Sequence, residues 1–167
     1  MGEIMINKIK DIIFRIVYVL IIIYLLTFIP SFFGYKPLVV ISGSMEPTLK
    51  VGSIIYYQQM DIDSFEKNDI LVYTTNNHII SHRIVEKSED GFITKGDANK
   101  TIDSDQVYEE QVLGKSTNWC IPFLGYYTDY IYHHKYLLYI CITVLIIDLA
   151  NDCYIKKKVG RLNEKNI

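Results

Sequence analysis

Residues 16–33 read IVYVLIIIYLLTFIPSFF, and this run of eighteen residues contains no charged side chain. A helix needs about 20 predominantly apolar residues to cross the hydrocarbon core of a bilayer, so the run predicts a transmembrane anchor. Lys8, Lys10 and Arg15 precede it, and the positive-inside bias therefore predicts a cytoplasmic N-terminus over residues 1–15. A cleaved secretory signal is the alternative, but it would need small residues after the run, where the sequence has PSFFGY.

A second apolar run, YLLYICITVLII, covers residues 136–147 and ends before Asp148. It can cross the bilayer if the helix extends over residues 136–155, with the basic residues of the tail 156–167 at the cytoplasmic side. The alternative is an interfacial or half-inserted helix. If the run spans, the protein crosses the cell membrane twice, and residues 34–134 form an extracytoplasmic domain.

The charge balance of residues 34–134 excludes one class of partner. The segment holds 14 acidic and 8 basic residues, a net charge of −6. No basic patch is present in it, which argues against nucleic acid as a ligand. Of the three cysteines, only Cys120 falls in this segment, so it has neither a disulfide framework nor a cysteine cluster of the metal-binding kind.

Short runs with the composition of β-strands follow one another between the two anchors. They are separated by turn residues, and no apolar pattern of helical period interrupts them. The sequence therefore predicts a mainly β fold, an antiparallel β-sheet flanked by transmembrane helices, with strands over residues 53–57, 69–74, 78–86, 92–95 and 111–115.

Three kinds of side chain in this segment could perform acid–base and nucleophilic chemistry. Ser44, in the stretch ISGSMEPTL at residues 41–49, carries an exposed hydroxyl in a glycine-containing turn. A hydroxyl becomes a useful nucleophile only when a base takes its proton. His82 is the candidate base, because imidazole titrates near neutrality. Asp97 and Asp103 are candidates for the carboxylate that orients it.

Each residue also has a structural interpretation. A serine beside glycine is usually part of a turn, and clusters of Asp and Asn after glycine usually are as well. A histidine in a strand is usually packed or exposed, and His78 lies four residues earlier on the same strand face as His82. Lys95 is an alternative base, but a lysine must be desolvated to lose its proton near neutral pH.

Taken together, five motifs in this order resemble the type I signal peptidases. The resemblance is closest to the endoplasmic-reticulum-like branch, found in archaea, eukaryotes and some Gram-positive bacteria, in which histidine replaces the lysine base. The motifs are SGSMEPT at residues 42–48, SHRI at 81–84, TKGDAN at 94–99, VLGK at 112–115 and IPFLG at 121–125.

The resemblance implies a role for each candidate. Ser44 matches the nucleophile and His82 the base. Asp103, six residues after the aspartate of the Gly-Asp pair, matches the catalytic aspartate, and Asp97 matches a second important carboxylate. Ser42 matches the residue whose hydroxyl helps the backbone N–H of Ser44 to form the oxyanion hole.

One departure from the family pattern leaves the choice between the two aspartates open. Lys100 and Ile102 stand where the family often has small or acidic residues. Either Asp97 or Asp103 could therefore be the carboxylate that orients the base.

The resemblance also implies the activity. The protein would be a membrane-bound serine endopeptidase that removes N-terminal signal peptides after small residues at positions −1 and −3, reading an extended substrate as an added strand. Its partners would be signal-peptide-bearing preproteins, the lipid bilayer and the secretion machinery. No metal and no organic cofactor is required.

Two other functions compete with this interpretation. One is a related self-cleaving protease with a Ser/Lys pair, which the two apolar anchors and His82 disfavour. The other is a membrane-tethered, non-enzymatic extracellular β-domain in which Ser44 occupies an ordinary turn. A serine-reactive probe would label Ser44 in a peptidase and not in a binding domain.

Overall fold

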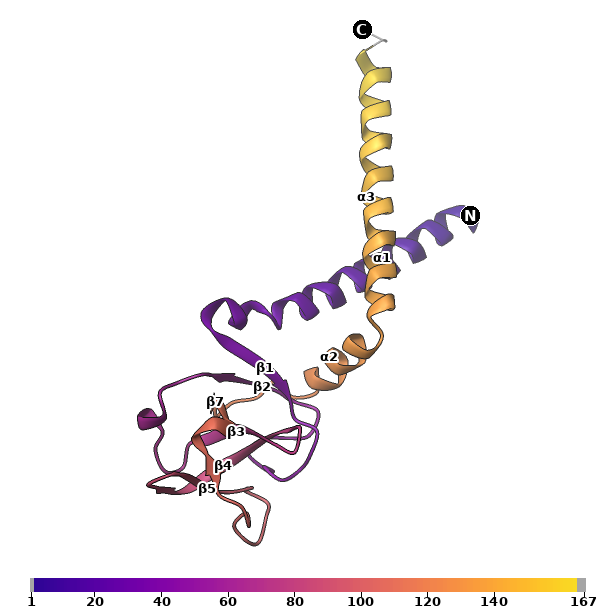
Figure 1. Cartoon of the computed structure of the whole chain (residues 1–167). Coiled ribbons are helices and arrows are strands. Elements are labelled where there is room, and N and C mark those ends of the chain that lie inside the picture. Colours follow the sequence, from indigo (N-terminus) through magenta and orange to yellow (C-terminus); the bar gives the residue numbers. More distant parts are fainter. Residues whose placement is uncertain (1, 165–167) are drawn as a thin grey trace. The chain divides into compact units, whose positions relative to one another are not determined.

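The structure is a computed structural model that describes residues 2–164. It separates into two units, of which one runs from Leu25 to Asp129 and contains the β-sheet. The helical segments before and after that stretch make up the other unit, and Figure 1 follows the chain through all of them. Every residue for which the sequence predicts a chemical role lies in the unit with the sheet, called here the β unit.

Long helices occupy the two ends of the described chain. They are α1 (Gly2–Leu26) and α3 (Lys135–Glu164), and a shorter helix, α2 (Leu124–His133), precedes α3. The segments Lys8–Phe33 and Lys135–Lys158 are long and apolar enough to cross a membrane, judged by length and composition alone. Their large apolar side chains are mostly exposed and not packed in a protein core. Such a pattern is expected of helices whose surroundings are apolar, such as lipid.

The end of the first apolar run is not α-helical. Ile29–Phe33 forms a short 3₁₀ helix, η1, which Gly34 ends in the left-handed conformation, with φ of 84°. Pro30 stands in its first turn, where a missing backbone N–H costs no helical hydrogen bond. The chain thus changes direction between the apolar segment and the first strand.

Seven strands form one sheet in the order β1-β2-β7-β3-β4-β5-β6. All neighbouring strands are antiparallel, so the predicted antiparallel sheet is confirmed. The strands are β1 (Tyr35–Val39), β2 (Ile54–Gln58), β3 (Ile70–Thr75), β4 (His78–Ser88), β5 (Gly91–Lys95), β6 (Val107–Tyr108) and β7 (Val112–Ser116). Single 3₁₀ turns, η2 (Ile62–Ser64) and η3 (Glu109–Gln111), lie between them.

The tight turn between β3 and β4 sets the register of the two central strands. Asn76 and Asn77 both have positive φ, 48° and 63°, as the central pair of a type I′ hairpin requires. This turn places Leu71 opposite His82 and Ile70 opposite Arg83. Because side chains alternate along a strand, His82 and Arg83 point to opposite faces of the sheet.

Apolar side chains fill both faces of the sheet. Phe65, Leu71, Tyr73, Ile84, Phe92 and Val107 form one cluster. Val40, Met45, Leu49, Ile55 and Ile70 form the other. Consecutive residues of β3, Ile70 and Leu71, belong to different clusters. This strand is therefore buried on both faces, and it is the central strand of the sheet.

Candidate active site

Ser44 lies in the turn that follows β1. Backbone hydrogen bonds from Glu46 N to Gly43 O (3.1 Å) and from Leu49 N to Met45 O (2.9 Å) close the turn. Met45 and Leu49 are 1% and 0% exposed and anchor it in the core, whereas Ser44 is only half-buried. The burial of its neighbours therefore fixes the serine while its hydroxyl remains accessible.

His82 reaches Ser44 from the middle of β4. Its Nε2 atom lies 3.1 Å from Ser44 Oγ, although the two residues are 38 positions apart in the sequence. The ring is 8% exposed, and Tyr73 on β3 contacts it edge-on, with ring centroids 6.4 Å apart. The imidazole is thus held on β4, which pairs with β3 over residues 78–83.

Asp103 completes the contact on the other side of the ring. Its Oδ2 atom lies 2.6 Å from His82 Nδ1, and its backbone N–H donates to Thr94 O at 2.9 Å. An ionised carboxylate can only accept hydrogen bonds, so Nδ1 carries the proton and Nε2 presents its lone pair to the Ser44 hydroxyl. A serine hydroxyl, an imidazole and a carboxylate in this order are the arrangement that serine hydrolases use for nucleophile, base and orienting group.

Two further side chains, to which the sequence analysis assigned no role, support Asp103. The Thr94 hydroxyl donates to Asp103 Oδ2 at 2.7 Å, and Tyr73 Oη lies 3.3 Å from that hydroxyl. Since Thr94 gives its proton to the carboxylate, it accepts from Tyr73. Burial raises the pKa of Tyr73, which keeps the phenol in its proton-donating form.

Within residues 2–164, the Asp97 carboxylate makes no hydrogen bond to Ser44 or His82. It binds Arg83 in a bidentate pair, Nε to Oδ1 at 2.7 Å and Nη2 to Oδ2 at 2.6 Å, and it accepts from the Thr48 hydroxyl at 2.6 Å. The hydrogen bonds from Arg83 hold the pKa of Asp97 below its usual value, and Thr48 lowers it further. Asp97 therefore joins the turn that contains Ser44 to strand β4, which carries His82.

The backbone around Asp97 also contacts Ser44. The N–H of Ala98 donates to the carbonyl oxygen of Ser44 at 2.8 Å. A Cβ atom placed on Gly96 would lie 2.5 Å from the same oxygen, well inside van der Waals contact. Only glycine lets the two segments approach this closely.

Ser42 lies beside Ser44, with the two hydroxyl oxygens 3.3 Å apart. Its side chain is exposed. Among residues 2–164 the backbone N–H of Ser44 has no hydrogen-bond acceptor. A side-chain hydroxyl and a backbone N–H are thus both available to a group bound beside Ser44.

Lys95, the alternative base, and His78, on the same strand as His82, are not hydrogen-bonded to Ser44 within the described residues. Lys95 is half-buried and stands opposite Arg83 in the β4–β5 pairing. Within the described part of the chain, no hydrogen bond or ion pair joins Lys95 to Ser44. His78 is exposed at the start of β4.

A groove of about 360 Å³ runs past the serine and the histidine. One wall is the segment Leu38–Ser42, which continues the edge strand β1, and the other is the first half of β4, His78–His82. In the pairing of the described strands, β5 meets β4 only from Arg83 onward, and β1 pairs only with β2. Both walls therefore present strand edges without partners.

Comparison with known proteins gives a consistent result. The family model described as "Signal peptidase, peptidase S26" matches residues 13–108. Signal peptidase I W of Bacillus subtilis (strain 168) is 35% identical over 128 residues, 68% of this chain and 67% of that protein. Signal peptidase complex catalytic subunits are also similar, such as SEC11 of Pyricularia oryzae, 34% identical over 113 residues, and sec11 of Sclerotinia sclerotiorum, 31% identical over 113 residues. Each of these two matches covers 59% of this chain and 65% of the relative.

Proposed function

The chain belongs to the signal peptidase family, peptidase S26, whose members are serine peptidases, and from this premise we propose that it cleaves N-terminal signal peptides from exported preproteins. In this proposal Ser44 is the nucleophile, His82 is the general base and Asp103 orients the base. The observation that carries it is the continuous contact from Ser44 Oγ to His82 Nε2 at 3.1 Å and from His82 Nδ1 to Asp103 Oδ2 at 2.6 Å.

The first half of the reaction forms an acyl-enzyme. As Ser44 Oγ attacks the carbonyl carbon of the scissile peptide bond, its proton passes to His82 Nε2. The Asp103 carboxylate accepts the hydrogen bond from Nδ1–H and stabilises the imidazolium that forms. His82 then gives the proton to the leaving amine, which departs as the new N-terminus of the mature protein.

The second half returns the enzyme to its starting state. A water molecule donates its proton to His82 and attacks the acyl carbon, and the Ser44 oxygen leaves with that proton. Negative charge develops on the carbonyl oxygen in both halves. The Ser42 hydroxyl and the backbone N–H of Ser44 are the proposed donors that stabilise it, and their availability beside the nucleophile supports this assignment.

The proposed substrate segment is an extended strand in the groove. The free edges of Leu38–Ser42 and His78–His82 offer backbone hydrogen bonds to such a segment. Val40 and Met45 line the groove and are themselves 7% and 1% exposed, so they form a firm apolar wall. We expect this wall to favour small side chains at positions −1 and −3 of the preprotein.

The proposed enzyme is anchored in the cell membrane by two helices. The apolar segments Lys8–Phe33 and Lys135–Lys158 support this topology, with the β unit on the extracytoplasmic side and both termini in the cytoplasm. The lipid bilayer is then a permanent partner. Two relatives are named as catalytic subunits of a signal peptidase complex, which supports contact with further components of the secretion machinery.

Co-expression with a secretory preprotein tests the proposal. Membranes that contain the wild-type chain should release a mature product whose mass places the cut after a small residue, and Ser44→Ala should abolish that product. Ser53→Ala is the matched control, because the Ser53 hydroxyl is buried and has no hydrogen-bond partner among residues 2–164. Cleavage that persists in Ser44→Ala would overturn the proposal, and a folded wild-type chain that cuts no preprotein would favour the binding domain.

The same assay distinguishes the two candidate bases. His82→Ala should lose activity by orders of magnitude, whereas Lys95→Ala should retain most of it. An active His82→Ala together with an inactive Lys95→Ala would assign the base to Lys95.

A further inference from the structure

A second groove lies in the β unit, on the other face of strands β1 and β2 from the core beneath Ser44. Leu38 and Ile55 are paired across these strands and pack with Met45 in that core. Tyr35 and Tyr56 belong to the alternate positions of the same two strands, so their side chains point to the opposite face. This second groove is therefore separate from the proposed substrate groove.

One half of the groove is apolar. It encloses about 330 Å³ between η1 and the sheet and is lined by Ile29, Pro30, Phe33, Tyr35, Tyr56, Thr117 and Trp119. The Tyr56 hydroxyl donates to Thr27 O at 3.0 Å, which ties the start of η1 to the sheet. The Tyr56 and Trp119 rings are 5.6 Å apart. Tyr56 is 1% exposed and Trp119 is 55% exposed, so Trp119 is the ring of this pair that faces the groove.

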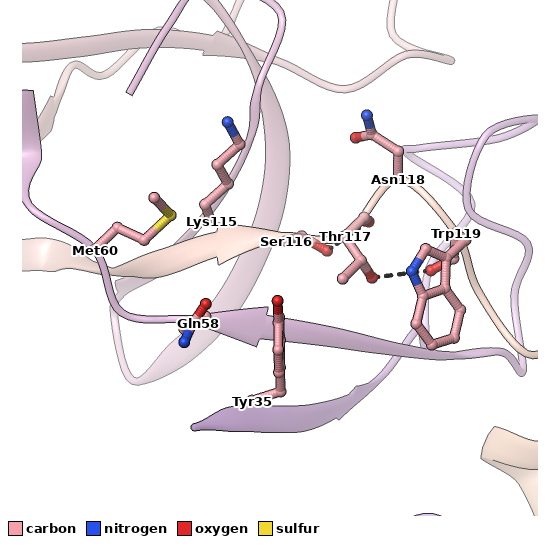
Figure 2. A pocket seen from close by; sticks show the side chains of 8 residues that line it. All are labelled: Tyr35, Gln58, Met60, Lys115, Ser116, Thr117, Asn118 and Trp119. Carbon is pink, nitrogen blue, oxygen red and sulfur yellow. Dashed lines mark hydrogen bonds between the residues drawn. The ribbon is translucent and has the colours of Figure 1, made fainter. Parts of the chain in front are cut away.

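The other half combines polar side chains with apolar ones and shares Tyr35, Thr117 and Trp119 with the first. It encloses about 430 Å³, and Figure 2 shows the side chains that surround it, with Trp119 and Met60 toward opposite ends of the view. Its additional lining residues include Gln58, Lys115 and Asn118. The Lys115 ammonium also contacts Asp69 Oδ1 at 2.7 Å, so this half offers hydrogen-bond donors more than a free positive charge.

The position of the groove along the chain identifies the kind of molecule that fits it. Ile29, Pro30 and Phe33 are the last residues of the apolar segment Lys8–Phe33. If that segment spans the bilayer, as the proposed function requires, its end lies where lipid acyl chains meet their polar headgroups. Phe33 and Trp119 are 71% and 55% exposed, and aromatic side chains of this kind concentrate at that boundary.

We infer that this groove binds one membrane phospholipid. An acyl chain occupies the half lined by Ile29 and Phe33, and the headgroup contacts Gln58, Lys115 and Asn118 in the other half. The pairing of an apolar cavity with an adjoining cluster of donors fits an amphiphile. A soluble polar metabolite would leave the apolar half without a suitable contact, and a free hydrocarbon would make no polar contact with Gln58, Lys115 and Asn118.

The single tryptophan of the chain makes the inference directly measurable, because Trp119 lines both halves. The full chain in phospholipid-free detergent is titrated with phosphatidylglycerol brominated on its acyl chains, which quenches nearby tryptophan. A bound lipid predicts quenching that saturates at about one lipid per chain while lipid is still a minor component of the micelles. Unbrominated phosphatidylglycerol should reverse it, and inorganic phosphate should not.

Quenching that rises in proportion to the lipid fraction, without saturation, would overturn the inference, because any tryptophan at a micelle surface behaves that way. Reversal by inorganic phosphate or by a synthetic signal peptide would also overturn it, in favour of a phosphate or peptide site. Thr117→Phe, whose larger side chain fills the groove, should remove the saturable quenching. Thr117→Val, whose side chain is close in size to threonine, should keep it. The wild-type titration decides the matter even if Thr117→Phe does not fold.

The proposed lipid site and the proposed peptidase activity can be tested independently of each other. The titration does not depend on catalysis, so the Ser44→Ala chain should show the same saturable quenching. Preprotein cleavage without saturable quenching would overturn only the lipid site. Saturable quenching without any cleavage would overturn only the proposed activity.

Discussion

Thr94 donates a hydrogen bond to the oxygen of Asp103 that also accepts from His82. The Thr94 Oγ1 to Asp103 Oδ2 distance is 2.7 Å, and the His82 Nδ1 to Asp103 Oδ2 distance is 2.6 Å. Thr94 is fully buried, so water cannot replace its hydroxyl. The orientation of the carboxylate therefore depends on a strand residue that does not line the groove beside Ser44.

Replacing Thr94 by valine removes this donor while keeping the shape of the side chain. One hydrogen bond to a charged group contributes about 1.5–3 kcal/mol, so we expect kcat for peptide cleavage to fall about 10- to 100-fold with little change in KM. Steady-state cleavage of a signal-peptide substrate measures both constants. Thr94→Ser keeps the hydroxyl and should restore most of kcat. An unchanged kcat in Thr94→Val, or a failure of Thr94→Ser to recover, would contradict a role in positioning Asp103.

The two aspartates should respond differently to the same substitution. Asp103→Asn disturbs the group that fixes the tautomer of His82, and we expect kcat to fall by about 10³- to 10⁴-fold with little loss of stability. Asp97→Asn leaves the contact between His82 and Asp103 in place, and should lower stability more than kcat. Cleavage rates and unfolding curves of the two variants give the comparison. The opposite order of activities would assign the orienting role to Asp97.

The sequence was sufficient for most of the sheet, because alternating β-type runs and turn residues mark β2, β3, β4, β5 and β7. It did not indicate β1, because this strand contains Pro37. Proline cannot donate a hydrogen bond to a neighbouring strand, and it is tolerated here because β1 lies at the edge of the sheet. It also missed the two-residue strand β6 and the helix α2, whose short or mixed patterns carry no clear period.

The site shows the same limit at the level of single residues. The motifs indicated Ser44, His82 and both aspartates, but only the fold separates Asp103 at the imidazole from Asp97 at Arg83. The role of Thr94 depends on which residues face one another across three strands and a loop. That information is tertiary, and no local pattern around Thr94 contains it.

Acidic pH should remove the stabilisation that Asp97 provides. Arg83 holds the pKa of Asp97 below its usual value, so its folded-state pKa is lower than its unfolded-state pKa. Such a group stabilises the fold above the unfolded pKa, and this contribution is lost as the pH falls through the folded pKa. We expect wild type to exceed Asp97→Asn in free energy of unfolding by about 1–3 kcal/mol at neutral pH, and the difference to shrink below about pH 4.

Denaturant unfolding in detergent, followed by Trp119 fluorescence, measures this difference at each pH. Asp105→Asn is the matched control, since Asp105 is exposed and its side chain makes no hydrogen bond within the described residues. It should leave stability nearly unchanged at every pH. A difference between wild type and Asp97→Asn that stays constant down to about pH 3 would show that the ion pair does not provide the stabilisation.

Gly96 should be required for the position of the nucleophile. The Cβ atom of alanine at this position would lie 2.5 Å from the carbonyl oxygen of Ser44, and the obstacle is backbone, so the turn that holds Ser44 must move. A displacement of about 1 Å costs about 10²-fold in rate, and we expect Gly96→Ala to lower kcat by about 10- to 100-fold. Gly43→Ala is the control on the other side of the serine, because its Cβ would meet the Glu46 side chain at an ordinary 3.6 Å. Cleavage assays and thermal unfolding of both variants test this expectation. Equal kcat values for the two variants would mean that the turn yields without moving the Ser44 hydroxyl away from His82.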